Sequence, residues 1–400
     1  MIAELGVLAA LAAAAPAAHV DRVIQEGMER SGMPGFAVAV VADGRTVHAR
    51  GFGDAGGGRR VTPRTPFVLG STSKSFTALA AMQLVDAGRL ELDAPVRRYV
   101  PEFGSDDRIT VRHVLQQTSG LPETAGGPIV KSAAEGSALA AVAELRDTRL
   151  ASAPGKAFEY TNANYILAGL VVERASGEPY PDYVRRHIFE PLGMRDSHVT
   201  LDAARRAGLA VGHRYWFGFR FAHGPTFRAG IQPAGYLIST AEDMARYLAL
   251  YVNDGVGADG RRIVSRRSLE TMLAPGRAGT LGPWADHAEA RYAMGWYIGG
   301  PWSEPAALHP GRAPDSSSLI AVFPRRKLAI VTLTNAANQL AVPGYPASID
   351  RVERNAVDVL LGERVATGTS LKRVYLYFDL VALALLAAAA WGSVRALRPR

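Results

Sequence analysis

The sequence predicts an α/β fold of the α+β kind, in which strands from both ends of the domain form one sheet and a mainly helical part lies between them. Apolar stretches of strand length occur near both ends of the domain. They are 35–41, 45–51, 294–297, 317–322 and 328–334. The intervening residues 88–289 show helical patterns separated by Pro and Gly loops. The predicted domain therefore spans 19–365, with its α/β part at 19–87 and 290–365.

Residues 1–18 precede this domain and are predicted to be a signal peptide or an N-terminal anchor. Positions 2–18 form an apolar, Ala-rich run that ends in small residues, as a secretory segment with a cleavage site does. The only charged residue in the run is Glu4, whereas secretory segments normally begin with Lys or Arg. A cleaved signal and an uncleaved anchor both stay open, and both predict export.

The first half of the α/β part is predicted to hold a helix, a β-hairpin and a strand that runs into a second helix. The first helix covers 19–32, and the hairpin strands flank a turn at 42–44. After a Gly-rich loop, a short strand at 66–70 leads into a helix over 72–87. The break between strand and helix falls at Ser71, so this serine is predicted to lie at a helix start.

The mainly helical part and the returning strands complete the domain. The clearest helices in the helical part are 111–117, 133–149, 163–176 and 240–253. Residues 324–327 form a turn between the last two predicted strands, and a final helix covers about 350–361. Because predicted strands stand on both sides of it in the sequence, the helical part is interpreted as an insertion into one sheet-containing domain. No internal repeat is visible.

The C-terminal residues predict a membrane anchor outside the domain. Residues 374–394 are 21 mostly apolar positions, about 31 Å long as a helix, which matches a bilayer core. Aromatic residues near its ends suit the membrane interface, and the Arg-rich residues 395–400 suit a cytoplasmic tail. We therefore expect a single-pass protein of the cell membrane with residues 19–365 outside the cytoplasm. A C-terminal helix packed on the domain is the alternative.

The composition excludes several classes of chemistry. The chain has no Cys, which rules out disulfides, thiol catalysis and Cys-ligated zinc. The net charge of +8 comes mostly from Arg, since only five of the 45 basic residues are Lys, and the basic residues are spread along the chain. A nucleic-acid partner is therefore not expected. No His pair has helical ligand spacing, so neither a metal nor another cofactor is expected.

The first chemical motif is Gly70-Ser71-Thr72-Ser73-Lys74 at the predicted helix start. A serine hydroxyl becomes a good nucleophile when a neighbouring base removes its proton, and a desolvated lysine can be that base. Among the five lysines, only Lys74 has a serine three residues before it. Ser71 is therefore predicted to be the nucleophile and Lys74 its activating partner, although the same spacing also occurs at ordinary helix starts.

Two further motifs could face the same cavity. Tyr160 and Asn162 would point to one side of an extended segment, where a phenol and an amide could converge. His309 and Gly311 are predicted to lie just before a strand, where Gly permits close approach to a ligand and His supplies a cation or a hydrogen bond. Taken alone, these residues are equally compatible with a half-buried Tyr, a helix-capping Asn and a surface His.

In this order and with these separations, the three motifs resemble the serine β-lactamase and penicillin-binding-protein superfamily, in its class C β-lactamase, DD-peptidase and family VIII esterase branch. The resemblance covers about residues 20–360 and includes segments that flank the motifs. These are FVLGS at 67–71, HVL at 113–115, TSGLP at 118–122, PAGYLISTAED at 233–243 and MGW at 294–296. It implies a β-lactamase/transpeptidase-like fold, with an antiparallel sheet flanked by helices, a helical domain beside it and the active site in the cleft between.

The resemblance also implies roles for the motif residues. Ser71 would be the nucleophile, and Lys74 and Tyr160 would share the work of general base and general acid. Asn162 would contact Lys74 and an amide of the substrate. His309 would take the place of the cationic first residue of the third family motif.

The end of the third motif would bind the substrate, but it departs from the family pattern. The backbone N–H groups of Ser71 and Arg312 would form an oxyanion hole, with Gly311 leaving room for the substrate. Position 310 is Pro, whereas the family usually has Ser or Thr, whose hydroxyl helps to hold a substrate carboxylate. Arg312 is a candidate to supply that contact instead.

These residues predict a serine hydrolase or acyltransferase that forms a Ser71 acyl-enzyme, of the DD-carboxypeptidase type acting on a D-amino-acid peptide. The substrate would be a small molecule or peptide, namely a cell-wall peptide, a β-lactam or an ester. A β-lactamase, a carboxylesterase, a peptide cyclase or thioesterase-type acyltransferase and a non-catalytic penicillin-binding sensor stay open. An α/β-hydrolase is disfavoured because the chain has no Gly-x-Ser-x-Gly sequence, and no Glu-x-x-Leu-Asn sequence supports the class A mechanism.

Overall fold

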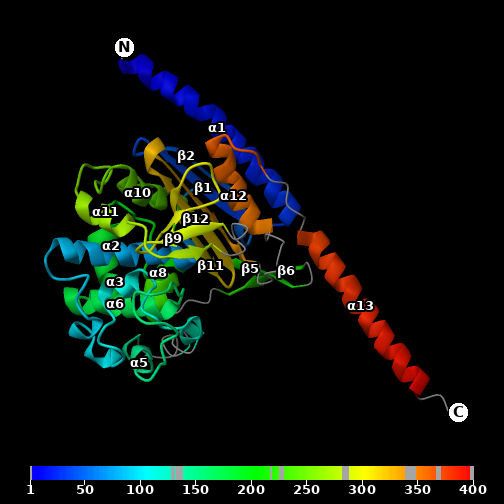
Figure 1. The fold of residues 1–400 in the computed structure, drawn as a ribbon. Helices are drawn as coiled ribbons and strands as arrows, with labels where there is room; N and C mark the ends of the chain where they lie inside the picture. The colour runs from blue at the N-terminus through cyan, green and yellow to red at the C-terminus, as the bar shows by residue number, and fades with distance from the viewer. Residues whose placement is uncertain are drawn as a thin grey trace.

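A computed structural model describes residues 2–127, 131, 138–216, 219–224, 229–281, 288–337, 348–365 and 371–396. Figure 1 shows a sheet covered by helices, a group of helices and loops beside it, and two long terminal helices, of which α13 and the N-terminal part of α1 extend away from the body. The strands come from both ends of the domain and the helical group from its middle. The predicted α/β fold class, with an antiparallel sheet and a helical part, is confirmed.

The main sheet has nine strands, in the order β3-β2-β1-β13-β12-β11-β10-β9-β8, and every neighbouring pair is antiparallel. Strands from the two ends of the domain meet where β1 pairs with β13. The central strands are buried on both faces because helices cover both faces. The strands are β1 Gly35–Ala42, β2 Arg45–Gly56, β3 Arg59–Arg60, β8 Ala278–Thr280, β9 Glu289–Tyr292, β10 Tyr297–Gly299, β11 Ala306–Ala313, β12 Ser316–Phe323 and β13 Leu328–Thr334.

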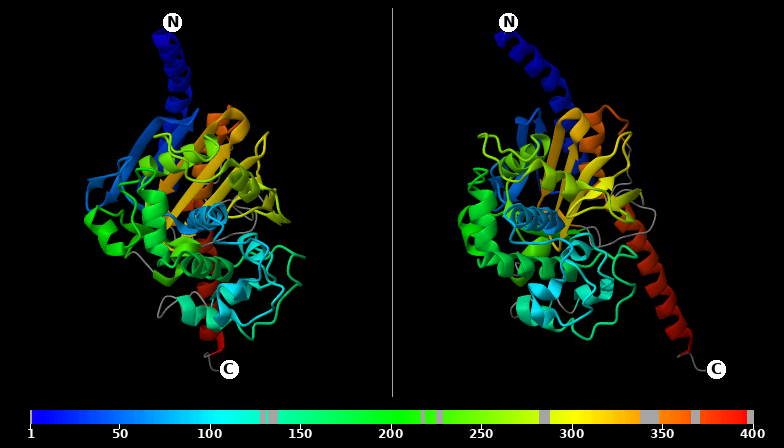
Figure 2. Two further views of the ribbon diagram at one scale, coloured as in Figure 1. Left: turned by 90° about the vertical axis from the view of Figure 1, so that its left-hand side faces the viewer. Right: turned by 60° about the vertical axis from the view of Figure 1, so that its left-hand side comes forward.

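Two layers of helices cover the sheet. On one face, α1 (Ile2–Ser31) packs against α12 (Ser348–Leu361) and contacts β1 and β2. On the other face, α10 (Ala241–Val252) contacts β1, β12 and β13, and the views in Figure 2 show the sheet between these layers. A Cβ at Gly27 would lie 2.4 Å from the Val352 side chain, so α1 and α12 can approach closely only with glycine there.

The helical part is built around α2 (Ser73–Asp86), which is buried along most of its length. Helices α6 (Asn162–Ser176), α9 (Gln232–Gly235) and α11 (Arg266–Leu273) pack around it. The other α-helices are α3 Val111–Leu115, α5 Ala138–Ala143, α7 Tyr180–Val184 and α8 Leu201–Arg206. The short 3-10 helices are η1 Gly70–Thr72, η2 Val96–Arg98, η3 Pro101–Phe103, η4 Glu123–Ala125, η6 Ala229–Ile231 and η8 Pro324–Arg326, and η5 Arg185–Phe189 is a π-helix. The remaining strands are β4 Phe67–Val68, β5 Gly212–Trp216, β6 Phe219–His223, β7 Ile238–Ser239 and β14 Ala336–Ala337.

The predicted hairpin is present as β1 and β2, but the prediction missed β11. Residues 309–311 lie inside this strand rather than just before a strand, because Pro310 and Gly311 suggested a loop. Strand β10 pairs only with 306–308 of β11, so a residue without an N–H group is tolerated at position 310. This correction places the third motif on the sheet itself.

Smaller corrections concern three other predicted elements. The strand predicted at 294–297 lies at 297–299, as β10. The short strand before Ser71 pairs with β7 in a separate two-stranded sheet. Of the helix predicted at 133–149, residues 138–143 are helical, 144–149 are turns and loop, and 133–137 lie outside the described residues.

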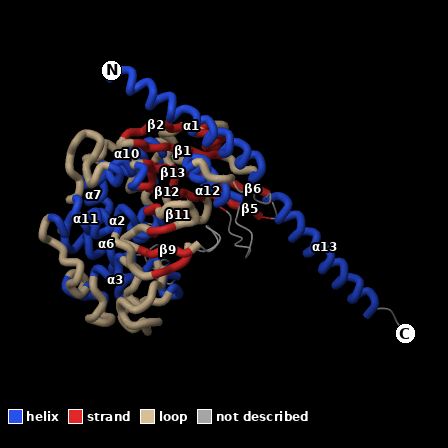
Figure 3. Tube along the Cα trace, turned by 45° about the horizontal axis from the view of Figure 1, so that its top comes forward, coloured by secondary structure: helices blue, strands red, loops and turns tan. Residues whose placement is uncertain are grey.

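Helix α13 (Leu371–Ala396) extends away from the body, as Figure 3 shows from a second direction. No residue of its segment Leu376–Ser393 is buried, and α13 is the one helix in the described part of the chain that is long and apolar enough to cross a membrane. The helix is thus compatible with the predicted anchor at 374–394. Residues 397–400 of the predicted tail lie outside the described residues, and the signal or anchor role of 1–18 stays a prediction.

Candidate active site

The turn that carries Ser71 depends on close backbone packing that glycine allows. After β4 the chain passes through η1 into α2, so Ser71 lies at the start of helical structure. Gly70 has a φ of +56°, and a Cβ there would lie 2.6 Å from the backbone nitrogen of Arg312. The edge of β11 therefore lies directly against the turn, and Ser71 is half-buried between α2 and this strand.

Lys74 lies one helical turn after Ser71 and is completely buried. Its Nζ lies 3.0 Å from Ser71 Oγ, 2.8 Å from Asn162 Oδ1 and 2.5 Å from the carbonyl oxygen of Ala234. Burial without a compensating carboxylate lowers the pKa of Lys74 to about 7. A neutral amine has two N–H groups and one lone pair. Asn162 and Ala234 can accept the two N–H groups, which leaves the lone pair for the Ser71 hydroxyl.

Tyr160 and Asn162 approach Lys74 from the start of α6. Thr161 caps this helix by accepting a hydrogen bond from the backbone N–H of Ala163. The Lys74 ammonium lies 4.9 Å from the centre of the Tyr160 ring. Burial raises the pKa of Tyr160 above its ordinary value, and a hydrogen bond with Ser71 opposes this shift only in part. Tyr160 is therefore a neutral phenol at neutral pH, suited to donate a proton rather than to accept one.

His309 lies within β11 and is buried, with 1% of its surface exposed. Its Nδ1–H donates to the carbonyl oxygen of Pro310 at 2.8 Å, so Nε2, 3.3 Å away from the Tyr292 hydroxyl, accepts from it. Burial and the nearby charge of Lys74 lower the pKa of His309 to about 3. Of the two roles predicted for His309, a hydrogen bond suits this environment better than a cation, because the rings that pack around it exclude the water that would stabilise a charge.

Gly311 and Arg312 continue β11 past the Ser71 turn. A Cβ at Gly311 would lie 2.2 Å from the carbonyl oxygen of Leu69, so the strand packs closely against the turn. The Arg312 guanidinium donates to Glu353 Oε2 at 3.0 Å and to Asp350, both of which lie on α12. Arg312 stays a candidate to bind a substrate carboxylate, but that carboxylate would have to compete with the two carboxylates of the protein that already bind the guanidinium.

Ser71, Asn162 and Arg312 line one cavity of about 120 Å³. The remaining lining residues are Ile231, Ala234, Gly235 and Tyr236. Lys74 and Tyr160 lie behind Ser71 and Asn162, so the structure brings the residues of the first two motifs together beside the edge of β11. The arrangement provides a hydroxyl, an amine of lowered pKa, a phenol and strand backbone around a space that a small acyl group can enter.

The family of the chain can be assigned from sequence comparison. Residues 20–349 match the Beta-lactamase family. The chain belongs to the beta-lactamase family. It is 31% identical over 316 residues to penicillin-binding protein 4 of Amycolatopsis lactamdurans, an alignment that covers 76% of this chain and 81% of that protein. Membership of the family and this relative support a serine hydrolase type of activity.

Two further proteins are similar to this beta-lactamase family member. Protein flp of Staphylococcus aureus is 25% identical over 324 residues, which are 79% of this chain but only 62% of that protein's length. The solved structure of an octameric penicillin-binding protein homologue from Pyrococcus abyssi superposes with a TM-score of 0.74 at 28% identity, covering 88% of this chain and 79% of that one. The shared fold places this chain in the serine β-lactamase and penicillin-binding-protein superfamily.

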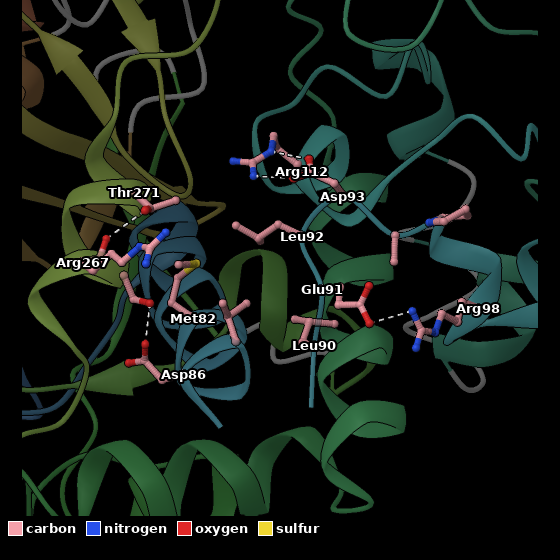
Figure 4. Close-up of a pocket in the computed structure, with 14 residues that line it drawn as sticks. Met82, Asp86, Leu90, Glu91, Leu92, Asp93, Arg98, Arg112, Arg267 and Thr271 are labelled. Carbon is pink, nitrogen blue, oxygen red and sulfur yellow. Dashed lines mark hydrogen bonds and ion pairs between the residues drawn. The ribbon is translucent and has the colours of Figure 1, made fainter. Parts of the chain in front are cut away.

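A larger cavity of about 810 Å³ lies at the opposite end of α2 from Ser71. Figure 4 shows two ion pairs on its wall, Arg112 with Asp93 and Arg98 with Glu91. None of the predicted catalytic or substrate-binding residues lines it. The smaller cavity beside Ser71, rather than this larger one, is the candidate active site of the family member.

Sequence reasoning missed several groups that hold the site. The carbonyl of Ala234 has no side-chain signature, so its contact with Lys74 could not be predicted. Behind Asn162, Gln117 Oε1 accepts from Asn164 Nδ2 at 2.6 Å and from the backbone N–H of Thr161 at 3.1 Å. The sequence marks 118–122 and 233–243 only as flanking segments. The first follows Gln117 directly, and the second contains Ala234, whose carbonyl binds Lys74.

Proposed function

We propose that this chain is a serine hydrolase that forms a Ser71 acyl-enzyme with a D-amino-acid peptide or a related ester or amide. The observation that supports this most is the buried Lys74 amine 3.0 Å from Ser71 Oγ. With a pKa of about 7, a large share of this lysine is the free amine at neutral pH and can take the serine proton. DD-carboxypeptidase, β-lactamase and carboxylesterase activities share this chemistry and differ in the acyl donor.

The proposed reaction has two steps. In the first, Ser71 Oγ bonds to the carbonyl carbon of the donor, and its proton passes to Lys74 Nζ. The leaving amine or alcohol departs with a proton that Tyr160 delivers, and Lys74 returns a proton to Tyr160. In the second step, water attacks the acyl-enzyme, the acid is released and Ser71 regains its proton. An amine in place of water would make the same enzyme an acyltransferase.

When Ser71 attacks, negative charge develops on the carbonyl oxygen of the substrate, and hydrogen-bond donors that are already in place stabilise it. The backbone N–H of Ser71 at the helix start and that of Arg312 on the neighbouring strand edge are the proposed pair. Support comes from Gly70, where the two backbone segments approach so closely that a Cβ would lie 2.6 Å from the Arg312 nitrogen. This packing holds both donors in a fixed relation before substrate arrives.

We also propose that the enzyme acts at the outer face of the cell membrane, with α13 as its anchor. The exposed apolar segment Leu376–Ser393 supports the anchor, and the Arg-rich end of the sequence supports a cytoplasmic C-terminus. Reporter fusions within the domain and after α13 test the topology. A cytoplasmic signal from the reporter in the domain would refute the outer location.

The function is tested by intact mass measurement of the full-length protein after mixing with a fluorescent penicillin and, separately, with p-nitrophenyl acetate. We expect a covalent adduct or turnover that Ser71→Ala abolishes and that Ser105→Ala, a half-buried serine away from the cavity, retains. An adduct that never turns over with either reagent would favour the penicillin-binding sensor. Absence of any Ser71-dependent reaction would overturn the proposal.

A further inference from the structure

Among its described lining residues, the cavity beside Ser71 has one guanidinium, that of Arg312. Carboxylates of the protein already compensate the charge of this guanidinium. Arg312 Nη2 donates to Asp350 and to Glu353 Oε2, while Nη1 donates to the carbonyl oxygen of Gly311 at 2.7 Å. The Glu353 side chain has no exposed surface and that of Asp350 is 13% exposed. One guanidinium is thus shared by two carboxylates that are largely shielded from water.

The hydroxyl groups at the same edge are also engaged. Ser318 lies opposite Gly311 on β12, and its Oγ donates to the carbonyl oxygen of Leu69 at 2.6 Å. Thr72 Oγ1 donates to the same carbonyl at 2.8 Å. Position 310, between His309 and Gly311, is a proline and has no hydroxyl. Neither hydroxyl can reach a substrate carboxylate without giving up a buried backbone acceptor.

The imidazole of His309 does not replace these donors. Its Nδ1–H is bound to the carbonyl of Pro310 and its Nε2 faces the hydroxyl of Tyr292. A charged imidazole would need a second proton on Nε2, directly where the Tyr292 hydroxyl donates. At the described part of this cavity edge, the guanidinium is therefore already paired with two carboxylates, and the Ser318 and Thr72 hydroxyls are already bound to a backbone carbonyl.

We infer that the site selects acyl donors without a free carboxylate on the leaving group. The inference rests on the proposed function and narrows it to esters, amidated peptides and internal peptide bonds, and it disfavours C-terminal dipeptides. A carboxylate next to the scissile bond would find Arg312 in the cavity lining and would have to compete with Asp350 and Glu353 for its guanidinium. Since like charges in a partly buried site repel strongly, the penalty is large enough to set specificity.

The test compares two donors that share one scissile bond, an N-acylated D-Ala-D-Ala and the same dipeptide as its C-terminal amide. Release of D-alanine or D-alaninamide by the full-length protein gives kcat/KM for each. We expect the amide to be preferred by about tenfold or more. Should neither dipeptide turn over, their inhibition constants against p-nitrophenyl acetate hydrolysis give the same ratio. A ratio that favours the free acid, or a ratio of one, overturns the inference.

A paired variant tests the cause of the preference. In Asp350→Asn with Glu353→Gln, Arg312 keeps its charge but loses both carboxylate partners, so the preference for the amide should fall toward one or reverse. The matched control is Asp358→Asn with Glu363→Gln, which removes two charges at the far end of α12, where these residues bind Trp302 and Ser303. An unchanged preference in the first variant, with Ser71-dependent ester hydrolysis intact, would show that Arg312 and its partners do not set it.

The two proposals fail in different ways. If the proposed function is wrong, neither p-nitrophenyl acetate nor a penicillin reacts with Ser71 in the wild-type protein. If only the inference is wrong, Ser71 reacts with neutral esters and the free-acid dipeptide is accepted equally well.

Discussion

Two cationic side chains lie at the candidate active site, the buried Lys74 and the partly exposed Arg312, and they are held in opposite ways. Lys74 contacts a hydroxyl, an amide oxygen and a backbone carbonyl, and no carboxylate in the described part of the chain contacts it. Arg312 contacts two carboxylates. Burial lowers the pKa of Lys74 to about 7, whereas the pKa of Arg312 is raised because attraction to its partners outweighs its burial.

The difference separates Lys74, which can lose its proton and act as a base, from Arg312, which keeps its charge and holds the structure together. A buried amine without a counter-ion easily loses its proton, and that proton can be exchanged with Ser71. A guanidinium never deprotonates in proteins, and its fork of donors binds β11 to α12. The four predictions below start with the variant that should have the largest effect, and each either breaks this distinction or sharpens it.

Lys74→Met should have the largest effect on activity. Without the amine, no group in the described site takes the Ser71 proton, because Tyr160 is a neutral phenol. We expect acylation by p-nitrophenyl acetate to fall by about 10³-fold, within the range of general-base catalysis. The rate of acyl-enzyme formation measures it, with Ser71→Ala as the baseline. A loss of less than about tenfold would mean that another group is the base.

Arg312→Met should instead have the larger effect on stability. Removing Arg312 leaves Asp350 and Glu353 buried without their partner, which should lower the free energy of unfolding by about 3 kcal/mol. Lys74→Met, by contrast, replaces a desolvated amine with an apolar chain of similar length and should change it by less than about 1 kcal/mol.

Denaturant unfolding of the two variants beside the wild type measures this contrast. Each serves as the control of the other, since both replace a basic side chain at the site by the same residue. Equal losses in both would show that pairing with carboxylates does not distinguish the two cations.

The sequence could predict the surroundings of Lys74 but not those of Arg312. The spacing of Ser71 and Lys74 within one helical turn is local, so their approach followed from the helix period alone. Tyr160 and Asn162 could be added because they flank the start of another helix in a family-like motif. The sheet built from both ends of the domain was likewise predictable, since its strands are apolar and well separated from the helical part, whereas its antiparallel order came from the family resemblance.

The partners of Arg312 show why its surroundings could not be predicted. Asp350 and Glu353 lie about forty residues further along the chain, on a helix whose packing against β11 no local pattern encodes. The strand β11 itself was missed because His309-Pro310-Gly311 has the residues of a turn. Which of the two predicted roles suits His309 could not be decided from the sequence for a related reason, since the aromatic rings around it come from separate strands and loops.

The pH dependence of acylation should follow the lowered pKa of Lys74. Because the free amine is the active form, the rate with a neutral ester should rise about tenfold per pH unit below 7 and level off above it. Rates between pH 5 and pH 9, corrected with Ser71→Ala, measure the profile. A midpoint near the ordinary lysine value would mean that Lys74 has a counter-ion in solution.

Asn162→Asp should turn Lys74 into a cation of the Arg312 kind. The Asn162 Oδ1 atom lies 2.8 Å from Lys74 Nζ, so an aspartate of the same shape would place a carboxylate there. An opposite charge at this distance favours the protonated amine and should raise the pKa of Lys74 by about one unit or more. At pH 7 the acylation rate should then fall about fivefold or more, and it should recover as the pH is raised toward 9.

Asn162→Ala is the control for this last variant, because it removes the same hydrogen bond without adding charge. It should lower the rate at every pH and leave the midpoint of the profile close to that of the wild type. If Asn162→Asp and Asn162→Ala shift the midpoint equally, the hydrogen bond rather than the missing counter-ion sets the state of Lys74. If only the aspartate shifts it upward, the absence of a carboxylate beside Lys74 is what makes this lysine a base.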